Sequence, residues 1–119
     1  MIDKAILCVD DEAIIVFSLK QALKARYAGR FIYETALSAE DAFDVIGELE
    51  DEGVRLVLVI SDWLMPGMKG DEFFRRVKLS CPGTKTILVT GQADRSVVEA
   101  LLREGIANSV VAKPWRDAE

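Results

Sequence analysis

The feature that most constrains the fold is a regular alternation of two hydrophobic patterns along the chain. Short apolar runs rich in β-branched residues alternate with longer segments in which apolar residues recur every three or four positions. The first pattern is typical of strands buried on both faces of a parallel sheet, and the second is typical of amphipathic helices. The runs that predict strands are 5–9, 31–35, 56–60, 86–89 and 109–112.

Strict alternation of strands and helices predicts a layered α/β domain with a parallel sheet and right-handed crossovers. The run 31–35 is more mixed than the others, so we expect it nearer an edge of the sheet. Ser38 precedes the acidic residues Glu40 and Asp41 at the start of a helical segment, where its hydroxyl can cap the helix. Only four residues follow Trp115. We therefore expect the last helix to be missing or truncated, and residues 1–119 to be the N-terminal part of a longer protein.

The composition argues against several classes of protein. Half of the 119 residues are hydrophobic, but no apolar run approaches the roughly 20 residues of a membrane-spanning helix. The first residues lack the basic and apolar pattern of a secretory signal, so we expect a cytoplasmic protein that does not contact a membrane. The net charge of −5 disfavours direct binding to nucleic acid, because neutralising phosphates requires a basic patch.

The chain contains no histidine and only two cysteines, Cys8 and Cys81. Histidine-dependent acid–base and nucleophilic catalysis is therefore excluded, and the residues of a typical zinc site are missing. Cys8 lies within the first apolar run and is expected to be a buried, inert thiol. Any polar chemistry must come from carboxylates, lysine, hydroxyl groups and a metal ion.

Polar side chains follow four of the five predicted strands. Asp10 and Asp11 follow the first, Asp62 the third, Thr90 the fourth and Lys113 the fifth. Because the carboxyl ends of parallel strands meet at one edge of a sheet, we expect these groups to converge on one crevice. Three carboxylates together favour a hard cation such as Mg²⁺, while a hydroxyl and an ammonium group can hold phosphate oxygens. The pattern suits phosphoryl transfer to a carboxylate.

Each of these residues also has an ordinary structural interpretation. The acidic residues from Asp10 to Glu12 could simply favour a helix N-terminus, and Asp62 could begin a turn. Thr90 could be a plain strand end, and Lys113 a solvated charge. Their joint placement at matching strand ends favours the functional interpretation.

The same residues carry a resemblance to a known family. A likeness to the receiver domain of two-component response regulators rests on Asp10-Asp11, on Asp62 followed by Met65-Pro66-Gly67 and Gly70, on Thr90-Gly91, and on Lys113-Pro114. The order and spacing match over nearly the whole chain. The resemblance implies a flavodoxin-like three-layer sandwich with five parallel strands in the order 2-1-3-4-5. It also implies phosphorelay signalling by a switch domain rather than by a turnover enzyme.

The resemblance implies a role for each residue around the metal. Asp62 resembles the aspartate that accepts the phosphoryl group, and it also contributes to the Mg²⁺ site. Asp11 resembles the direct carboxylate ligand, and Asp10 resembles the residue that holds the ion through water. The backbone carbonyl of Leu64 would be a further ligand.

The resemblance also implies how the phosphoryl group is detected. Thr90 resembles the hydroxyl that turns toward it, and Lys113 resembles the lysine that pairs with it. Many relatives carry an aromatic residue three positions before this lysine, where this chain has Val110. Leu64 and Gln92 occupy two positions at which relatives set the rate of phosphate loss.

The implied phosphodonor is a sensor histidine kinase or a phosphotransfer protein. The segments 90–94 and 113–115 resemble receivers attached to histidine kinases or to HD-GYP-type phosphodiesterases, and a homodimer is also compatible with the family. Two alternatives stay open. The first is a degenerate receiver that acts only as a protein-interaction module. The second is a phosphatase of the haloacid-dehalogenase type, although its pattern calls for a second aspartate where this chain has Glu12.

Overall fold

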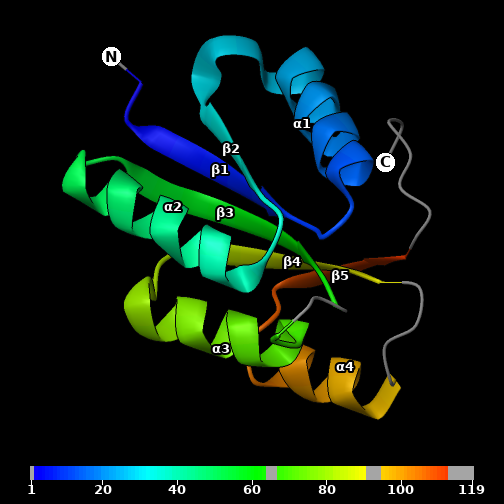
Figure 1. Cartoon of the computed structure of the whole chain (residues 1–119). Coiled ribbons are helices and arrows are strands. Elements are labelled where there is room, and N and C mark those ends of the chain that lie inside the picture. Colours follow the sequence, from blue (N-terminus) through cyan, green and yellow to red (C-terminus); the bar gives the residue numbers. More distant parts are fainter. Residues whose placement is uncertain (1, 64–66, 91–94, 113–119) are drawn as a thin grey trace.

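The computed structural model describes residues 2–63, 67–90 and 95–112. In this part of the chain, strands and α-helices alternate from the first element to the last (Figure 1). The elements are β1 (Lys4–Val9), α1 (Ala13–Tyr27), a short 3₁₀ helix (Ala28–Arg30), β2 (Ile32–Ala36), α2 (Ala39–Asp51), β3 (Arg55–Asp62), α3 (Gly70–Ser80), β4 (Lys85–Thr90), α4 (Arg95–Arg103) and β5 (Ser109–Ala112).

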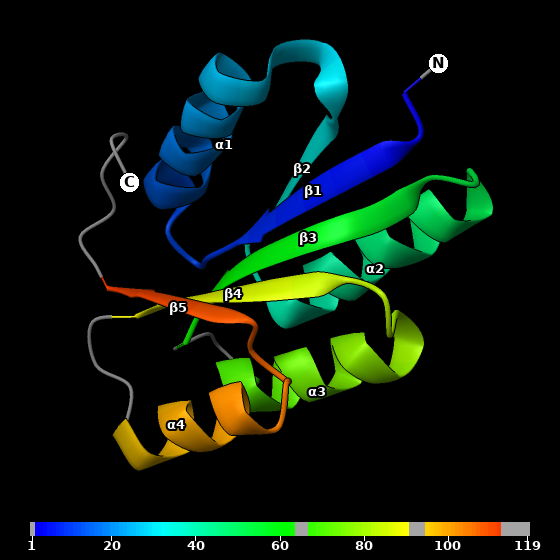
Figure 2. The same ribbon diagram turned by 180° about the vertical axis from the view of Figure 1, so that it is seen from behind.

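The five strands form one parallel sheet in the order β2-β1-β3-β4-β5. This order confirms the predicted flavodoxin-like topology, including the edge position of the second strand. Helix α1 covers one face of the sheet, and α2, α3 and α4 cover the other (Figures 1 and 2). The described elements therefore form three layers, as predicted.

The core is divided by the sheet into two hydrophobic clusters. The larger cluster lies on the side of α2, α3 and α4, and its largest fully buried side chains include Phe73, Phe74 and Leu88. The smaller cluster lies on the side of α1 and contains Leu19 and Ile60. Strands that are buried on both faces need nearly continuous apolar sequence, which is the pattern that predicted them.

Two local predictions can be compared with the structure. Ser38 caps α2 as predicted, because its Oγ accepts a hydrogen bond of 3.1 Å from the N–H of Asp41. The third strand is longer than the predicted run 56–60, since β3 continues through Asp62. Its neighbours extend it: Ser61 pairs with Val9 of β1, and Asp62 pairs with Val89 of β4.

The expected truncation of a fifth helix falls on residues 113–119, which lie outside the described residues.

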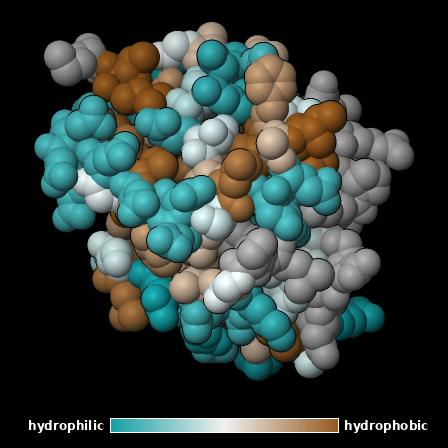
Figure 3. Space-filling model, in the orientation of Figure 1, coloured by the Kyte–Doolittle hydropathy of each residue, from teal (hydrophilic) through white to brown (hydrophobic). Residues whose placement is uncertain are grey.

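None of the helices in the described part of the chain has the length and apolar character that a membrane span requires. The face of the molecule in Figure 3 is largely hydrophilic, with hydrophobic residues in small groups rather than in one broad patch.

Candidate functional site

The two central strands bring three carboxylates together at the carboxyl edge of the sheet. Asp10 and Asp11 follow β1 directly, and Asp62 is the last residue of β3. Because Val9 pairs with Ser61, the residue after Val9 falls beside the residue after Ser61. One carboxylate oxygen each from Asp10, Asp11 and Asp62 lies within 4.8 Å of the other two. The convergence predicted from the strand ends is therefore present for these three residues.

The three carboxylates differ in exposure. Asp10 and Asp62 are buried, with 5% and 8% of their surface exposed, and Asp11 is exposed. Like charges at this separation repel one another, and burial strengthens the repulsion. A divalent cation relieves it, and a donor set of oxygen atoms without histidine or cysteine fits a hard ion such as Mg²⁺.

Backbone N–H groups orient the two buried carboxylates. The N–H of Glu12 donates to Oδ1 of Asp10 at 2.9 Å, and the N–H of Trp63 donates to Oδ1 of Asp62 at 2.8 Å. Hydrogen bonds to a carboxylate are stronger than those between neutral groups. Each acid is thus held in one orientation at the end of its strand before a ligand arrives.

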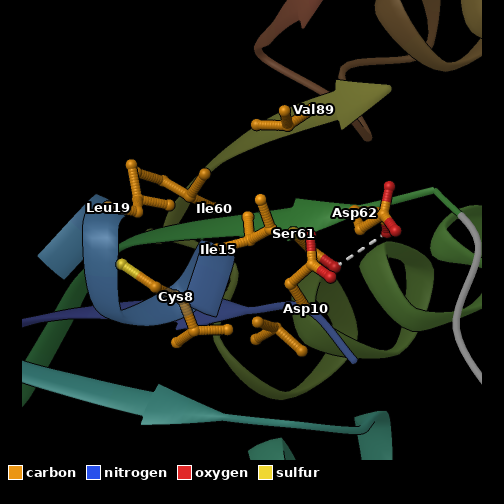
Figure 4. Close-up of a pocket in the computed structure, with 10 residues that line it drawn as sticks. Cys8, Asp10, Ile15, Leu19, Ile60, Ser61, Asp62 and Val89 are labelled. Carbon is orange, nitrogen blue, oxygen red and sulfur yellow. Dashed lines mark hydrogen bonds between the residues drawn. The ribbon is translucent and has the colours of Figure 1, made fainter. Parts of the chain in front are cut away.

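A small cavity adjoins the carboxylates of Asp10 and Asp62 (Figure 4). Asp10, Ser61 and Asp62 line one end of it, and Cys8 and Ile60 are among its apolar lining residues. Its volume of about 10 Å³ leaves room for about one water molecule at most. Burial also raises the pKa of the Cys8 thiol to about 12, which keeps it neutral, as the prediction of an inert thiol requires. The cavity is too small for a phosphoryl group, so such a ligand would have to bind outside it.

Helix α3 begins very close to this site. The N–H of Gly70 donates to the carbonyl of Trp63 at 2.8 Å. A Cβ at residue 70 would lie 3.1 Å from the carbonyl oxygen of Asp62, so a side chain there would meet the strand end. Glycine thus lets α3 start directly against the residue that carries the buried acid.

The remaining predicted site residues fall at other strand ends or outside the described part. Thr90 is the last residue of β4 and is partly buried, one residue beyond the Val89 that pairs with Asp62. Leu64, Gln92 and Lys113 lie outside the described residues, so their predicted roles stay predictions.

One polar side chain at the site was not predicted to act there. Ser61 is fully buried, and its hydroxyl donates to the backbone carbonyl of Asp62 at 3.0 Å. The sequence carries a weak signal for it, because a hydroxyl residue interrupts an apolar strand immediately before the acid. That signal alone does not distinguish a site residue from an ordinary strand end.

Comparisons with known proteins identify the family. The response regulator receiver domain matches residues 6–119, so the chain belongs to the response regulator receiver family, whose members are signalling switches. The chain is 28% identical to the signal receiver domain of an HD domain-containing protein from Pseudomonas fluorescens Pf-5, with a TM-score of 0.80 over 97% of this chain and 86% of that one.

Two curated relatives share shorter stretches with the chain. It is 44% identical over 61 residues to a probable chemotaxis protein CheY of Rhizobium etli, a match that covers 49% of this chain and 46% of the relative. It is 33% identical over 89 residues to the sensor kinase CckA of Brucella abortus, covering 75% of this chain and 9% of the relative. The matched regions therefore span about half of one curated relative and about a tenth of the other.

Proposed function

We propose that this receiver domain accepts a phosphoryl group on Asp62 in a reaction that depends on Mg²⁺. The observation that carries the proposal is the convergence of Asp10, Asp11 and Asp62 within 4.8 Å at the carboxyl edge of the sheet. Open parallel sheets bind their ligands at this edge. Membership of the receiver family supports the same assignment.

The described residues suit the chemistry of phosphoryl transfer. An oxygen of Asp62 forms a bond to phosphorus while the bond between phosphorus and a nitrogen of the donor phosphohistidine breaks, and the donor imidazole leaves. Asp10 and Asp11 would hold the metal with Asp62, and the backbone carbonyl of Leu64 would complete the protein ligands. A bound Mg²⁺ offsets the negative charge that the carboxylates and the transferred group bring together.

Phosphorylation would switch the neighbouring strand ends. It adds about 1.5 to 2 negative charges at Asp62. Thr90 lies at the end of β4, next to β3, where its hydroxyl can turn toward the new group, and Lys113 would pair with it. The change would reach the surface of α4 and β5, where an output domain or partner would detect it.

The names of the relatives suggest the partners. We propose a sensor histidine kinase or a phosphotransfer protein as the phosphodonor, in the cytoplasm. One curated relative is a sensor kinase, and one similar structure comes from an HD domain-containing protein. A histidine kinase or an HD-GYP-type phosphodiesterase is therefore the output domain that we propose, and a homodimer is compatible with this arrangement.

Calorimetric titration with Mg²⁺, followed by addition of beryllofluoride, tests the site without any turnover. Beryllofluoride stands in for the phosphoryl group on an aspartate. We expect Asp11→Asn to weaken Mg²⁺ binding and Asp62→Asn to abolish the beryllofluoride complex. Asp44→Asn, which removes an exposed acid on α2, is the matched control and should change neither. Equal affinities in all four proteins would show that the acidic cluster does not hold the metal.

A further inference from the structure

Ser61 stands immediately before the proposed phosphoacceptor and has no exposed surface. We propose that Ser61 is a positioning residue, which fixes the orientation of the Asp62 carboxylate through the peptide bond between Asp62 and Trp63. The inference rests on the proposed role of Asp62.

Ser61 lies near the carboxyl end of β3, the central strand of the sheet. Ser61 pairs with Val9 of β1 on one side and with Leu88 of β4 on the other, so its backbone is fixed by both neighbouring strands. A buried hydroxyl needs a hydrogen-bond partner. This one donates to the carbonyl oxygen of Asp62 at 3.0 Å (Figure 4).

The peptide group transmits this contact to the reactive side chain. The carbonyl of Asp62 and the N–H of Trp63 belong to one planar unit, so fixing one fixes the direction of the other. That N–H donates to Oδ1 of Asp62 at 2.8 Å. A tilt of the peptide plane would therefore move the N–H away from the carboxylate and allow the carboxylate to rotate.

The start of helix α3 packs against the same peptide group. A Cβ built on Gly70 would lie 3.1 Å from the carbonyl oxygen of Asp62, so little free space remains on that side. The N–H of Gly70 donates at 2.8 Å to the carbonyl of Trp63, which belongs to the next peptide group along the chain. The peptide group between Asp62 and Trp63 is thus hydrogen-bonded to the Ser61 hydroxyl and to the Asp62 carboxylate, and the start of α3 limits its movement.

Orientation matters because the attacking oxygen must be aligned with the phosphorus atom. A displacement of about 1 Å can cost a reaction roughly a hundredfold in rate. Ser61→Ala keeps all three carboxylates but removes one of the contacts on the peptide group. We expect it to slow phosphorylation of Asp62 by about tenfold, within that limit.

Thr84→Val is a matched control for the loss of a buried hydroxyl. Thr84 is also buried, and its hydroxyl donates to a backbone carbonyl of the same strand, that of Leu56, at 2.7 Å. Leu56 lies six positions before Asp62 on β3, which places it roughly 20 Å from the site. Both variants lose the same kind of hydrogen bond, but only one loses it beside the carboxylate.

The test measures two quantities in each folded variant. The first is the rate at which acetyl phosphate forms a covalent adduct at saturating Mg²⁺, and the second is the exchange rate of the Trp63 backbone amide by NMR. We expect Ser61→Ala to react about tenfold more slowly and to exchange this amide faster, while Thr84→Val stays within about twofold of wild type in both. Ser61→Thr keeps the hydroxyl and should react within about threefold of wild type.

A Ser61→Ala protein with the reaction rate and amide exchange of wild type would overturn the inference. So would an equal loss of rate in Thr84→Val, which would show an effect of stability alone, or a folded Ser61→Thr protein as slow as Ser61→Ala. If the wild type itself forms no adduct, the proposed function fails instead. The Trp63 amide would still show whether Ser61 holds the peptide group.

Discussion

Replacing Gly70 by alanine tests how closely α3 must approach the site. The new Cβ would lie 3.1 Å from the carbonyl oxygen of Asp62, 3.1 Å from Cα of Trp63 and 3.3 Å from Cδ1 of Leu88. The first two are backbone atoms at a strand end, so the helix or the strand must shift by a few tenths of an ångström. Overpacking of this kind costs about 1–3 kcal/mol, and alanine in a helix returns up to about 1 kcal/mol. The free energy of unfolding should therefore fall by about 0–3 kcal/mol.

The rate of phosphorylation should fall more than this small loss of stability suggests. The displaced backbone belongs to the phosphoacceptor itself, so a shift there misaligns the attacking oxygen and should cost about tenfold in rate. Urea unfolding followed by circular dichroism gives the stability, and adduct formation with acetyl phosphate gives the rate.

Gly47→Ala is the matched control. Gly47 lies on the exposed side of α2, and nothing lies within 4 Å of the Cβ that alanine would add. We expect this variant to gain up to about 1 kcal/mol in stability and to keep the rate of wild type. A Gly70→Ala protein that is as stable and as fast as wild type would refute the packing argument.

Three further predictions concern residues that take no direct part in the proposed reaction. Ala28 has φ of 49°, which favours glycine, so Ala28→Gly should raise the free energy of unfolding by about 1 kcal/mol in urea unfolding, and a decrease would contradict this. Because burial raises the pKa of Cys8 to about 12, iodoacetamide should leave this thiol unmodified until the protein unfolds, and rapid labelling of the native protein in a peptide map would argue otherwise. The hydrogen bonds and charge of Arg75 lower the pKa of Glu104, so their contact is lost only as the pH falls through that lowered value. NMR titration of Arg75→Met should show this pKa returning toward its ordinary value of 4.5, and no change would show that the contact is absent in solution.

Hydrophobic periodicity predicted the strands and the layers because each pattern reports burial directly. It did not predict the end of β3, since Ser61 and Asp62 are polar and belong to the strand only through pairing with β1 and β4. Hydrophobic periodicity also did not predict that Ala28 would adopt a positive φ. This alanine follows the last residue of α1 and has φ of 49°, although a glycine, Gly29, comes directly after it.

The acidic part of the site was predictable for a geometric reason. The carboxyl ends of parallel strands meet at one edge, so Asp10, Asp11 and Asp62 had to converge once the topology was right. The contacts of Ser61 and Gly70 were not predictable, because they depend on distances between elements. The roles of Leu64 and Lys113 stay predictions that follow from the family resemblance.

Uptake of a phosphoryl group by Asp62 can be measured directly. Intact mass spectrometry of the protein incubated with acetyl phosphate, with and without Mg²⁺, measures this for wild type and for Asp62→Asn. We expect a gain of one phosphoryl group in the wild type with Mg²⁺, and none without the metal or in the variant. A folded wild type that gains no mass with Mg²⁺ would contradict the proposed function and would favour a receiver that acts only as a protein-interaction module.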